Sequence, residues 1–275
     1  MAADPLSEIK HIICVASGKG GVGKSTTAVN LALSLLRLGL KTGVLDADIY
    51  GPSIPHLLGI EDGSRPQITP DRKMVPMLAH GLQCNSVGLL VDAKTAMVWR
   101  APMIISAFNQ ILGDTAWDSL DCLVVDLPPG TGDIQLSLAQ NVSVSGAVIV
   151  TTPQDLALLD ARKGIEMFGK VSVPVLGVVE NMSTHICSSC GAEEAIFGEG
   201  GGKRLADEYS VPVLGRLPLA LSIRECSDSG EPIVVAAPES REAESYLEIA
   251  KKIQDGLIGQ SSTVTSAPTI SIVDD

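Results

Sequence analysis

The stretch "ASGKGGVGKSTTAVNLAL", from Ala16 to Leu33, decides the fold of this 275-residue chain. Its residues Gly18 to Ser25 fit the pattern G-x-x-x-x-G-K-[ST], and they lie between an apolar segment and a segment of helical periodicity. A glycine-rich backbone turns its N–H groups onto phosphate oxygens, and the helix that follows adds the positive end of its dipole. The stretch therefore predicts a P-loop nucleotide site. The competing interpretation is a glycine-rich turn without a ligand.

The loop contains two lysines, although phosphate binding needs only one. Lys24 supplies the point charge for the β- and γ-phosphates, and the Ser25 hydroxyl is suited to Mg²⁺. That arrangement leaves the side chain of Lys19 without an assigned role, and a solvated surface lysine is the alternative for it. The predicted nucleotide-binding residues in and after the loop are Gly18, Lys19, Gly20, Gly21, Val22, Gly23, Lys24, Ser25 and Thr26.

Acidic residues follow two further apolar segments. Asp126 in "LVVDLPPGTGD" comes before a glycine-rich loop, where a magnesium-holding carboxylate belongs. Asp46 and Asp48 in "LDADIYGPS" also follow an apolar run. Open parallel sheets bind ligands at the carboxyl ends of their strands, which predicts that all three carboxylates lie near the loop. A helix cap or a turn residue is the alternative for each of them.

Short runs rich in Val and Ile alternate with longer helical patterns, which predicts a parallel sheet. We expect one P-loop NTPase domain of the α/β class over residues 1–258, with a mostly parallel central sheet and helices on both faces. The polar segment 259–275 is expected to be a disordered tail. The predicted strands are His11–Ser17, Lys41–Asp48, Asp121–Pro128, Gly146–Thr152, Val173–Asn181 and Val211–Pro218. Helices are expected to begin near Ser25, Pro102, Asp133, Asp155 and Gly201, with a last one from Glu239 to about Leu257.

Composition limits the function. Aromatic residues make up only 3% of the chain, so the core must consist of Val, Leu, Ile and Ala. A net charge of −12 opposes nucleic-acid binding, which depends on clustered lysine and arginine. The sequence shows neither a signal peptide nor an eighteen-residue apolar stretch. We expect a cytoplasmic protein, or one of the mitochondrial matrix if a presequence has been removed.

Cys187 and Cys190 form a Cys-x-x-Cys pair, which places two thiolates within reach of one metal. A closed site needs four ligands, so only half of a site is visible in one chain. Three completions compete: a [4Fe–4S] cluster bridged by the same pair of a second chain, a zinc ion, and a redox dithiol. The spacing does not separate zinc from iron–sulfur. We expect Cys14, Cys84 and Cys122 to pack in the core. The role of Cys226 as a spare ligand stays open, and His185 is either an alternative ligand or an ordinary loop residue.

These motifs together resemble a known family. The segments "SGKGGVGKST", "DADIYGPS", "DLPPGTGD", "TTPQDLALLDARKG", "VVENMS" and "IRECSDSGEPIV", with the cysteine pair, run in the order and spacing of the Mrp/ApbC family of iron–sulfur carrier ATPases. The resemblance covers about Ile9 to Gln254 and is closest to the branch that includes the mitochondrial assembly factor for respiratory complex I.

The resemblance implies a homodimer that sandwiches ATP and passes a labile [4Fe–4S] cluster to apoprotein clients, with slow ATP hydrolysis as its switch. It implies that Lys19 reaches the partner's nucleotide, as an arginine finger does. Asp46 would activate water, Asp126 would organise Mg²⁺ and Asn181 in "ENMS" would contact adenine. The implied catalytic residues are Lys19, Lys24 and Asp46; Asp48, Asp126 and Asn181 join the nucleotide site, Ser25 ligates magnesium, and Cys187 and Cys190 bind the cluster.

Two other classes of function share the loop. A MinD/ParA-like positioning ATPase works on membranes or DNA, but the net charge opposes DNA and the C-terminus lacks a basic amphipathic helix for stable membrane anchoring. It also leaves the cysteine pair without a purpose. A metabolic kinase or synthetase needs an acceptor-substrate site, and the sequence shows none.

Overall fold

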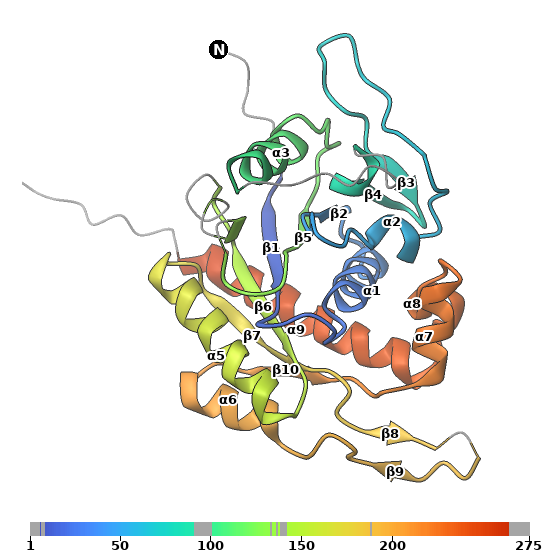
Figure 1. Ribbon diagram of the computed structural model, residues 1–275, viewed down its shortest axis with the longest axis vertical. Helices are drawn as coiled ribbons and strands as arrows, with labels where there is room; N and C mark the ends of the chain where they lie inside the picture. Colours follow the sequence, from blue (N-terminus) through green and yellow to red (C-terminus); the bar gives the residue numbers. More distant parts are fainter. Residues whose placement is uncertain are drawn as a thin grey trace, which may run out of the picture.

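The computed structural model describes residue 6 and residues 9–90, 101–132, 134, 135, 137, 142–187 and 189–263. At its centre is an eight-stranded sheet with the order β10-β7-β6-β1-β5-β2-β4-β3 (Figure 1). All neighbours in this order are parallel except β3 and β4, which are antiparallel. The strands span His11–Ala16 (β1), Thr42–Asp46 (β2), Met77–Ala79 (β3), Leu82–Ser86 (β4), Cys122–Asp126 (β5), Gly146–Thr151 (β6), Val175–Glu180 (β7) and Val213–Arg216 (β10).

The central strands consist of apolar residues because helices cover both faces of the sheet. Every residue of β5 and β6 is buried. Such continuous burial favours runs of Val, Ile and Leu over the alternating pattern of a half-exposed sheet. Because β1, β5 and β2 are parallel neighbours, their carboxyl ends meet at one edge of the sheet.

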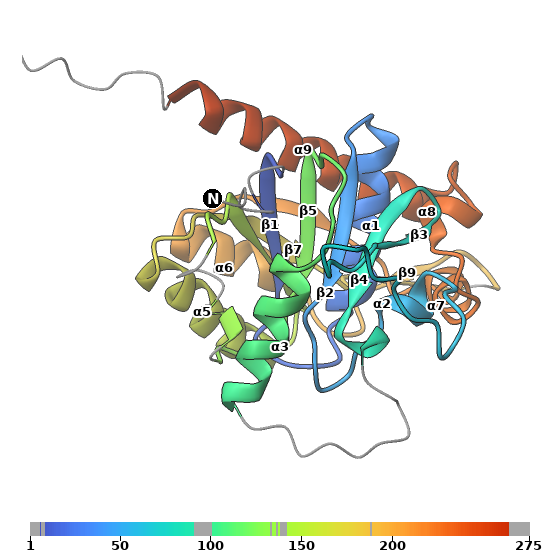
Figure 2. The ribbon, with the colours of Figure 1, turned by 90° about the horizontal axis from the view of Figure 1, so that it is seen from above.

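The helices divide between the two faces (Figure 2). One apolar cluster joins the sheet to α3 (Ala101–Gly113), α5 (Asp155–Lys170) and α6 (Gly201–Tyr209). The other joins it to α1 (Lys24–Arg37), α2 (Ile54–Leu57), α8 (Ile233–Ala236) and α9 (Arg241–Thr263), with α7 (Leu221–Asp228) beside α8. The predicted fold class, an α/β P-loop NTPase with a mostly parallel sheet, is confirmed.

The six predicted strands are all present, each somewhat shorter than predicted. The sequence did not reveal the β3–β4 hairpin, because β3 has three residues and its turn is His80–Gly81, an uncommon pair for a two-residue turn. Both turn residues have the positive φ that such turns require, 49° and 85°. The short helices α2, α7 and α8 were also missed. The start of the helix expected near Asp133 lies outside the described residues.

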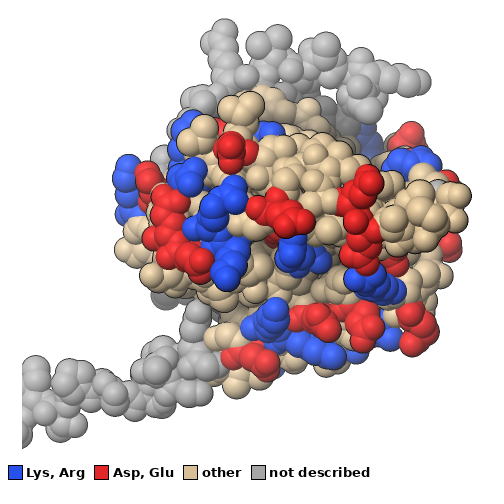
Figure 3. Space-filling view, turned by 90° about the horizontal axis from the view of Figure 1, so that it is seen from below, with Lys and Arg blue, Asp and Glu red and all other residues tan. Residues whose placement is uncertain are grey.

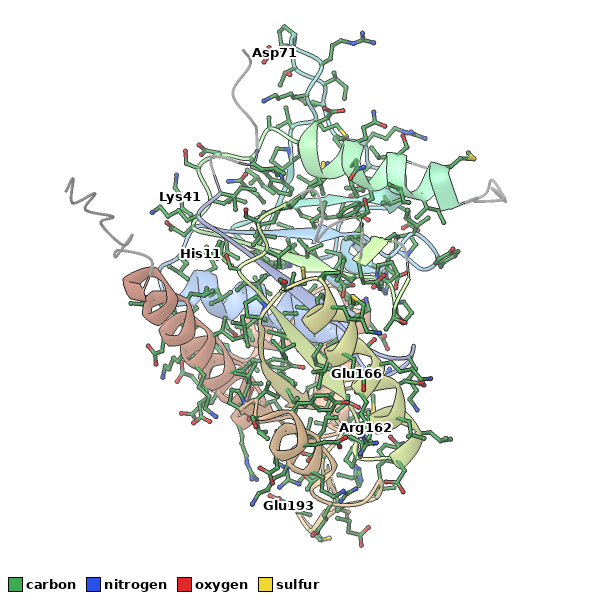
Figure 4. All side chains as sticks on the ribbon, turned by 90° about the vertical axis from the view of Figure 1, so that its left-hand side faces the viewer. His11, Lys41, Asp71, Arg162, Glu166 and Glu193 are labelled. Carbon is green, nitrogen blue, oxygen red and sulfur yellow. The ribbon has the colours of Figure 1, made fainter. Side chains whose placement is uncertain are left out.

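A separate two-stranded antiparallel sheet projects from the lower end of the molecule in Figure 1. It pairs β8 (His185–Ile186) with β9 (Glu193–Glu194). Arg241, the first residue of α9, reaches Glu193 at 2.5 Å and ties this β8–β9 hairpin to the main body. In Figure 4, Glu193 lies at the end of the molecule opposite Asp71.

The last helix is longer than predicted. It continues to Thr263, so the expected start of a tail at residue 259 falls within α9. Gly256 and Gly259 do not end the helix, because a glycine inside a helix costs only about 1 kcal/mol relative to alanine. Residues 264–275 lie outside the described ones. Of the helices in the described part of the chain, none combines the length and the apolar character that a bilayer crossing requires.

Candidate nucleotide and thiolate sites

Strand register brings the predicted acidic residues to the loop. Asp126 lies opposite Val15 of β1 on one side and opposite Asp46 of β2 on the other. The P-loop follows β1 directly, so its backbone and the carboxylates at the ends of β2 and β5 share one edge of the sheet. The sequence-based placement of these residues agrees with the structure.

Two glycines shape the P-loop. Gly23 caps α1 in the left-handed conformation, with φ of 79°, and a side chain there would collide with the Asn181 amide, since its Cβ would lie 2.2 Å from Nδ2. Gly18 packs against α5, where a Cβ would lie 2.2 Å from the carbonyl carbon of Asp160. The first turn of α1 contains no acidic residue, so its positive dipole end remains suited to phosphate.

Lys24 lies at the centre of a buried charge cluster. Its Nζ atom is 2.7 Å from Oδ1 of Asp126 and 3.6 Å from Oδ2 of Asp48, and it donates a hydrogen bond of 3.3 Å to the Ser25 hydroxyl. Burial raises the pKa of Asp126, and the nearby ammonium of Lys24 opposes that rise. Lys24 therefore favours the ionised form of Asp126.

Two carboxylate oxygens of this cluster have no hydrogen-bond partner among the described residues although they are buried. They are Oδ1 of Asp48 and Oδ2 of Asp126. Buried polar atoms without partners are rare in proteins and call for a ligand. Carboxylate and hydroxyl oxygens are the ligands that Mg²⁺ prefers, so Asp126, Asp48 and Ser25 fit a magnesium ion chemically.

Asp46 is fully buried and accepts four hydrogen bonds. Oδ1 accepts from the Asp48 N–H at 3.1 Å, and Oδ2 accepts from the N–H groups of Ser53 and Ile54 and from the Ser86 hydroxyl at 3.0 to 3.1 Å. Burial and, secondly, the charge of Asp126 raise the pKa of Asp46 to about 7. A carboxylate with a pKa near neutrality is suited to accept a proton from water.

Ser86 is a site residue that the sequence did not indicate. It ends β4 opposite Asp46, and its Oγ accepts from the Gly88 N–H at 3.0 Å. An ionised carboxylate only accepts hydrogen bonds, so the Ser86 hydroxyl donates its proton to Asp46 and accepts from Gly88 through a lone pair. No sequence signal pointed to Ser86, since β4 itself had not been recognised.

Asn181 and Lys19 flank the loop from two sides. Asn181 is buried, and its Nδ2 donates to the Val22 carbonyl at 2.8 Å, so it holds the P-loop backbone. Its predicted contact with adenine remains a prediction. Lys19 is half-buried, and within the described part of the chain its side chain has no ion pair or hydrogen bond. Only its carbonyl is engaged, by the Ser17 hydroxyl at 2.9 Å.

The cysteine pair lies in the turn of the β8–β9 hairpin. The Cys187 N–H donates to the Ala192 carbonyl and the Gly191 N–H donates to the Cys187 carbonyl, both at 2.9 Å, which closes the turn. Hydrogen bonds from the backbone N–H groups of Cys190 and Ser189 lower the pKa of the Cys187 thiol. Thiolates are the form that binds metals, so the turn prepares Cys187 as a ligand.

The other cysteines do not join this pair. Cys14, Cys84 and Cys122 are buried in strands, where burial raises the pKa of each thiol, as expected for packing residues. Cys226 is half-buried in α7, and burial also raises its pKa. His185 Nδ1 lies 3.3 Å from the Leu219 carbonyl oxygen. Among the described residues no three Cys, His, Asp or Glu side chains are grouped to hold a metal, so each chain offers two thiolates.

Comparisons with known proteins agree with these features. A sequence model of the ParA family, described as NUBPL iron-transfer P-loop NTPase, matches residues 8–254. The iron-sulfur cluster carrier protein of Haemophilus influenzae is 57% identical over 258 residues, covering 94% of this chain and 70% of that protein. The iron-sulfur cluster transfer protein NUBPL of Mus musculus is 51% identical over 251 residues, covering 90% and 78%. A nucleotide-binding protein of Archaeoglobus fulgidus, solved with ADP, has a TM-score of 0.74 at 36% identity, covering 88% and 94%.

Proposed function

Since the chain belongs to the family of NUBPL-type iron-transfer P-loop NTPases, we propose that it is an ATP-dependent carrier that holds a [4Fe–4S] cluster on a homodimer and transfers it to apoproteins. The observation that carries this proposal is the coexistence of two sites. One is a P-loop with a buried Lys24–Asp126 pair, and the other is an exposed turn in which backbone N–H groups favour the Cys187 thiolate. A positioning ATPase uses only the first.

Nucleotide binding would rearrange the charge cluster. Lys24 leaves Asp126 for the β- and γ-phosphates, and the oxygens of Asp126, Asp48 and Ser25 become available to Mg²⁺. Mg²⁺ held by these oxygens would neutralise charge on the phosphates. The buried oxygens of Asp48 and Asp126 that lack partners support this exchange, because both are already withdrawn from water.

Hydrolysis would use Asp46 and Lys19. Asp46, with a pKa near 7, accepts the proton of the attacking water once one of its four hydrogen bonds opens. Lys19 acts on the nucleotide of the second chain and stabilises the charge that develops on the transferred phosphoryl group. Its lack of an intrachain partner within the described residues supports a role across the interface.

The two sites are directly connected along the chain. Residues 182–186 are all that separate Asn181, which holds the P-loop at Val22, from Cys187. Within that segment Ser183 bonds the Leu217 carbonyl through both its N–H and its hydroxyl, at 2.9 and 3.1 Å. A change in the P-loop on nucleotide binding therefore has a short path to the thiolates. This supports slow hydrolysis as a switch for cluster binding or release.

Anaerobic reconstitution with iron and sulfide tests the carrier function. A cubane cluster takes four protein ligands, and each chain offers two, so we expect about four irons per two chains and a dimer on loading. Cys187→Ala and Cys190→Ala should each abolish both effects, whereas Cys226→Ala serves as the matched control and should retain them. About four irons on a monomer would place the remaining ligands within one chain, and tight zinc with no capacity for iron would remove the carrier function.

Transfer is tested with the loaded protein. An acceptor apoprotein of the [4Fe–4S] class should gain its cluster from the reconstituted dimer, and the rate should depend on whether Mg-ATP is present. A transfer rate that is the same with and without nucleotide would leave the carrier in place but remove the switch. The identity of the clients and the cytoplasmic location remain predictions.

A further inference from the structure

One buried acceptor has no role in the nucleotide site described above. Gln135 is 1% exposed, and its Oε1 atom has no hydrogen-bond partner among the described residues. Its amide nitrogen is fully used, because Nε2 donates to the carbonyls of Pro128 at 2.8 Å and of Gly130 at 3.1 Å. These two bonds fix the side chain and leave its oxygen as a lone acceptor. A buried polar atom without a partner calls for a donor from outside the fold.

A small pocket contains this amide, and we call it the Gln135 pocket. It has a volume of about 100 Å³, and its other lining residues are Tyr50, Ile104, Pro128, Pro129, Gly132 and Ile134. Tyr50 is 73% exposed, whereas Ile104 and Ile134 are buried, so the pocket leads from the surface toward the core. Its walls are mainly aliphatic and aromatic, which suits an apolar group.

Gly132 leaves the approach to the lone acceptor open. A Cβ on Gly132 would lie 3.6 Å from Oε1 of Gln135, which is van der Waals contact. Both residues line the pocket, so Oε1 is reached from within it. Because position 132 is a glycine, a donor atom that enters the pocket has room to take the place of that methyl group.

The Gln135 pocket lies between the two loops that carry the nucleotide-site carboxylates. On one side, Tyr50 comes two residues after Asp48. On the other, the loop after Asp126 contains Gly130, whose N–H donates to the Ser17 carbonyl at 2.8 Å and ties this loop to the start of the P-loop. A group bound in the pocket therefore contacts both segments that nucleotide binding rearranges under the proposed function.

The size of the pocket favours one side chain of a partner protein over a cofactor. Sites for drug-sized ligands and cofactors have volumes of roughly 300–1,000 Å³, well above that of the Gln135 pocket. On the face of the molecule shown in Figure 3, acidic and basic side chains are interspersed, so that face offers a partner no large area of one charge. The pocket instead selects by shape and by one hydrogen bond.

The chemistry of the pocket favours an indole ring. None of the described residues that line it is charged, so an ammonium or guanidinium donor would be buried at high cost. A hydroxyl would bring lone pairs, and both N–H groups of Gln135 are already occupied. Indole combines an apolar ring with an N–H group that only donates, which matches apolar walls around a lone acceptor.

We propose that the Gln135 pocket binds the indole ring of a tryptophan on a partner protein, with the indole N–H donating to Oε1 of Gln135. The inference rests on the proposed function, in which the carrier has to contact the apoproteins that receive its cargo. Tryptophans that fill small pockets are among the side chains that dominate interface energies. Because the pocket adjoins both nucleotide loops, the nucleotide state changes the affinity for the partner, and the partner changes the affinity for nucleotide by the same factor.

The test titrates the full chain, free of nucleotide and cluster, with N-acetyl-L-tryptophanamide and follows the ligand by NMR. The matched ligand is the same amide methylated at the indole nitrogen, which has no donor. We expect it to bind at least about tenfold more weakly, because Oε1 of Gln135 then stays unpaired. Gly132→Ala puts a methyl group in the donor's place and should abolish the difference between the ligands. Equal affinities of the two ligands for wild type would overturn the inference.

A second variant tests the wall of the pocket. Tyr50→Ala should raise the dissociation constant of N-acetyl-L-tryptophanamide at least about fivefold, as truncation of a contact at the centre of an interface does. The matched control is Leu78→Ala on β3, which is 76% exposed and does not line the pocket, and it should bind like wild type. The same loss in both variants would place the ligand elsewhere. Mg-AMPPNP should change the wild-type affinity at least about fivefold, and an unchanged affinity would overturn the coupling to the nucleotide loops.

The chain's own tryptophans are the alternative source of an indole. Trp117 is buried, and its Nε1 donates to the Leu112 carbonyl at 3.4 Å, so it is engaged elsewhere. Trp99 lies outside the described residues. Trp99→Phe should leave the affinity for N-acetyl-L-tryptophanamide unchanged. Tighter binding in this variant would show that Trp99 of the same chain or of a second copy competes for the pocket, and the partner protein would be removed from the inference.

Cluster transfer connects the pocket to the partner. An excess of N-acetyl-L-tryptophanamide should slow transfer from the reconstituted protein to a [4Fe–4S] apoprotein, and the methylated ligand should not. Transfer that neither ligand slows would overturn the role of the pocket in partner contact and leave the carrier function intact. Failure of the chain to load or transfer a cluster would remove the proposed function, whereas the ligand titrations contain no iron and would still decide whether the pocket binds indole.

Discussion

Nζ of Lys24 lies 2.7 Å from Oδ1 of Asp126, and both side chains are buried. The two residues are far apart in the sequence, and the parallel pairing of β1 with β5 brings them together. Lys24, which the P-loop pattern predicts to bind phosphates, is thus paired with the Asp126 carboxylate. The same ion pair holds the Lys24 side chain inside the site. Each residue of the pair depends on the other for stability.

We predict that Lys24→Ala destabilises the nucleotide-free protein as well as weakening ATP binding. Removing one member of a buried pair costs up to about 3–5 kcal/mol, because the other charge is left without a partner. Without Lys24 the pKa of Asp126 rises further above its unfolded value. The folded state then binds a proton more tightly than the unfolded state, so stability is present at low pH and is lost as pH rises through that pKa.

Urea unfolding of the nucleotide-free variant at about pH 5.5 and about pH 8 checks this prediction, with the larger loss expected at the higher pH. Lys24→Ala/Asp126→Asn is the control and should recover much of the stability at about pH 8, since no unpaired carboxylate remains. A loss from Lys24→Ala that is the same at both pH values would mean that packing, and not the charge of Asp126, sets the cost.

Lys19→Ala should have a different effect from Lys24→Ala. We expect it to spare most ATP binding and to lower turnover by about 10³-fold or more, as loss of a finger residue does. Lys19→Ala chains mixed with Asp46→Ala chains should regain activity, because one site of each mixed dimer combines an intact Asp46 with the partner's intact Lys19. At equal mixing, about a quarter of wild-type turnover is expected, since half of the dimers are mixed and each has one working site.

Turnover is measured across mixing ratios, and mixed dimers are verified by differential tagging. If mixed dimers form and no ratio restores activity, Lys19 acts within its own chain. Mixing Lys19→Ala with Lys24→Ala is a useful comparison, because Lys24 belongs to the nucleotide site of its own chain and the same logic predicts one restored site.

The sequence predicted the nucleotide site better than it predicted the site's surroundings. The P-loop and the strand-end carboxylates were predictable because parallel strands place their carboxyl ends at one edge, whatever the details of packing. The hydrogen bond from Ser86 to Asp46 was not, since it depends on β4, and β4 belongs to a hairpin whose three-residue partner strand has no distinctive pattern. The close approach of Gly18 to Asp160 depends on helix packing, which leaves no local signal.

The cysteine pair shows the same division. Spacing predicted that Cys187 and Cys190 bind one group, and it left zinc, iron–sulfur and redox chemistry open. The two-residue strands β8 and β9 are too short for periodicity to reveal. The N–H groups that lower the pKa of Cys187 come from the fold of the turn, and only the structure shows them.

The pH dependence of turnover should report Asp46. Its pKa is raised to about 7 in the free protein, and the active form is the ionised one, so kcat/KM should fall as pH decreases through about 7. Asp46→Asn should lower turnover strongly with nearly unchanged ATP affinity, because the proposed function has Asp46 act on water and not on the bound phosphates.

Ser86→Ala provides the control for this assignment. The Ser86 hydroxyl lowers the pKa of Asp46, so its removal should move the acid limb of the kcat/KM profile to higher pH, and Ser86→Thr should restore the limb. Equal loss of ATP binding and turnover in Asp46→Asn would instead assign this residue to the fold or to magnesium.

Thiol reactivity distinguishes the ligand cysteines in the cluster-free protein. N–H groups of Cys190 and Ser189 lower the pKa of Cys187, whereas burial raises the pKa of Cys226. At about pH 7 a larger fraction of Cys187 is therefore thiolate, and iodoacetamide should modify it faster than Cys226, even though a lower pKa makes each thiolate somewhat less nucleophilic. Raising the pH should narrow the difference between the two modification rates, because Cys226 ionises at higher pH.

Peptide mass spectrometry over time measures both sites in the same sample, with Cys187→Ser confirming the assignment of the fast site. Equal rates at neutral pH would mean that the turn does not favour the Cys187 thiolate, and the β8–β9 hairpin would then hold its cysteines without preparing them for a metal.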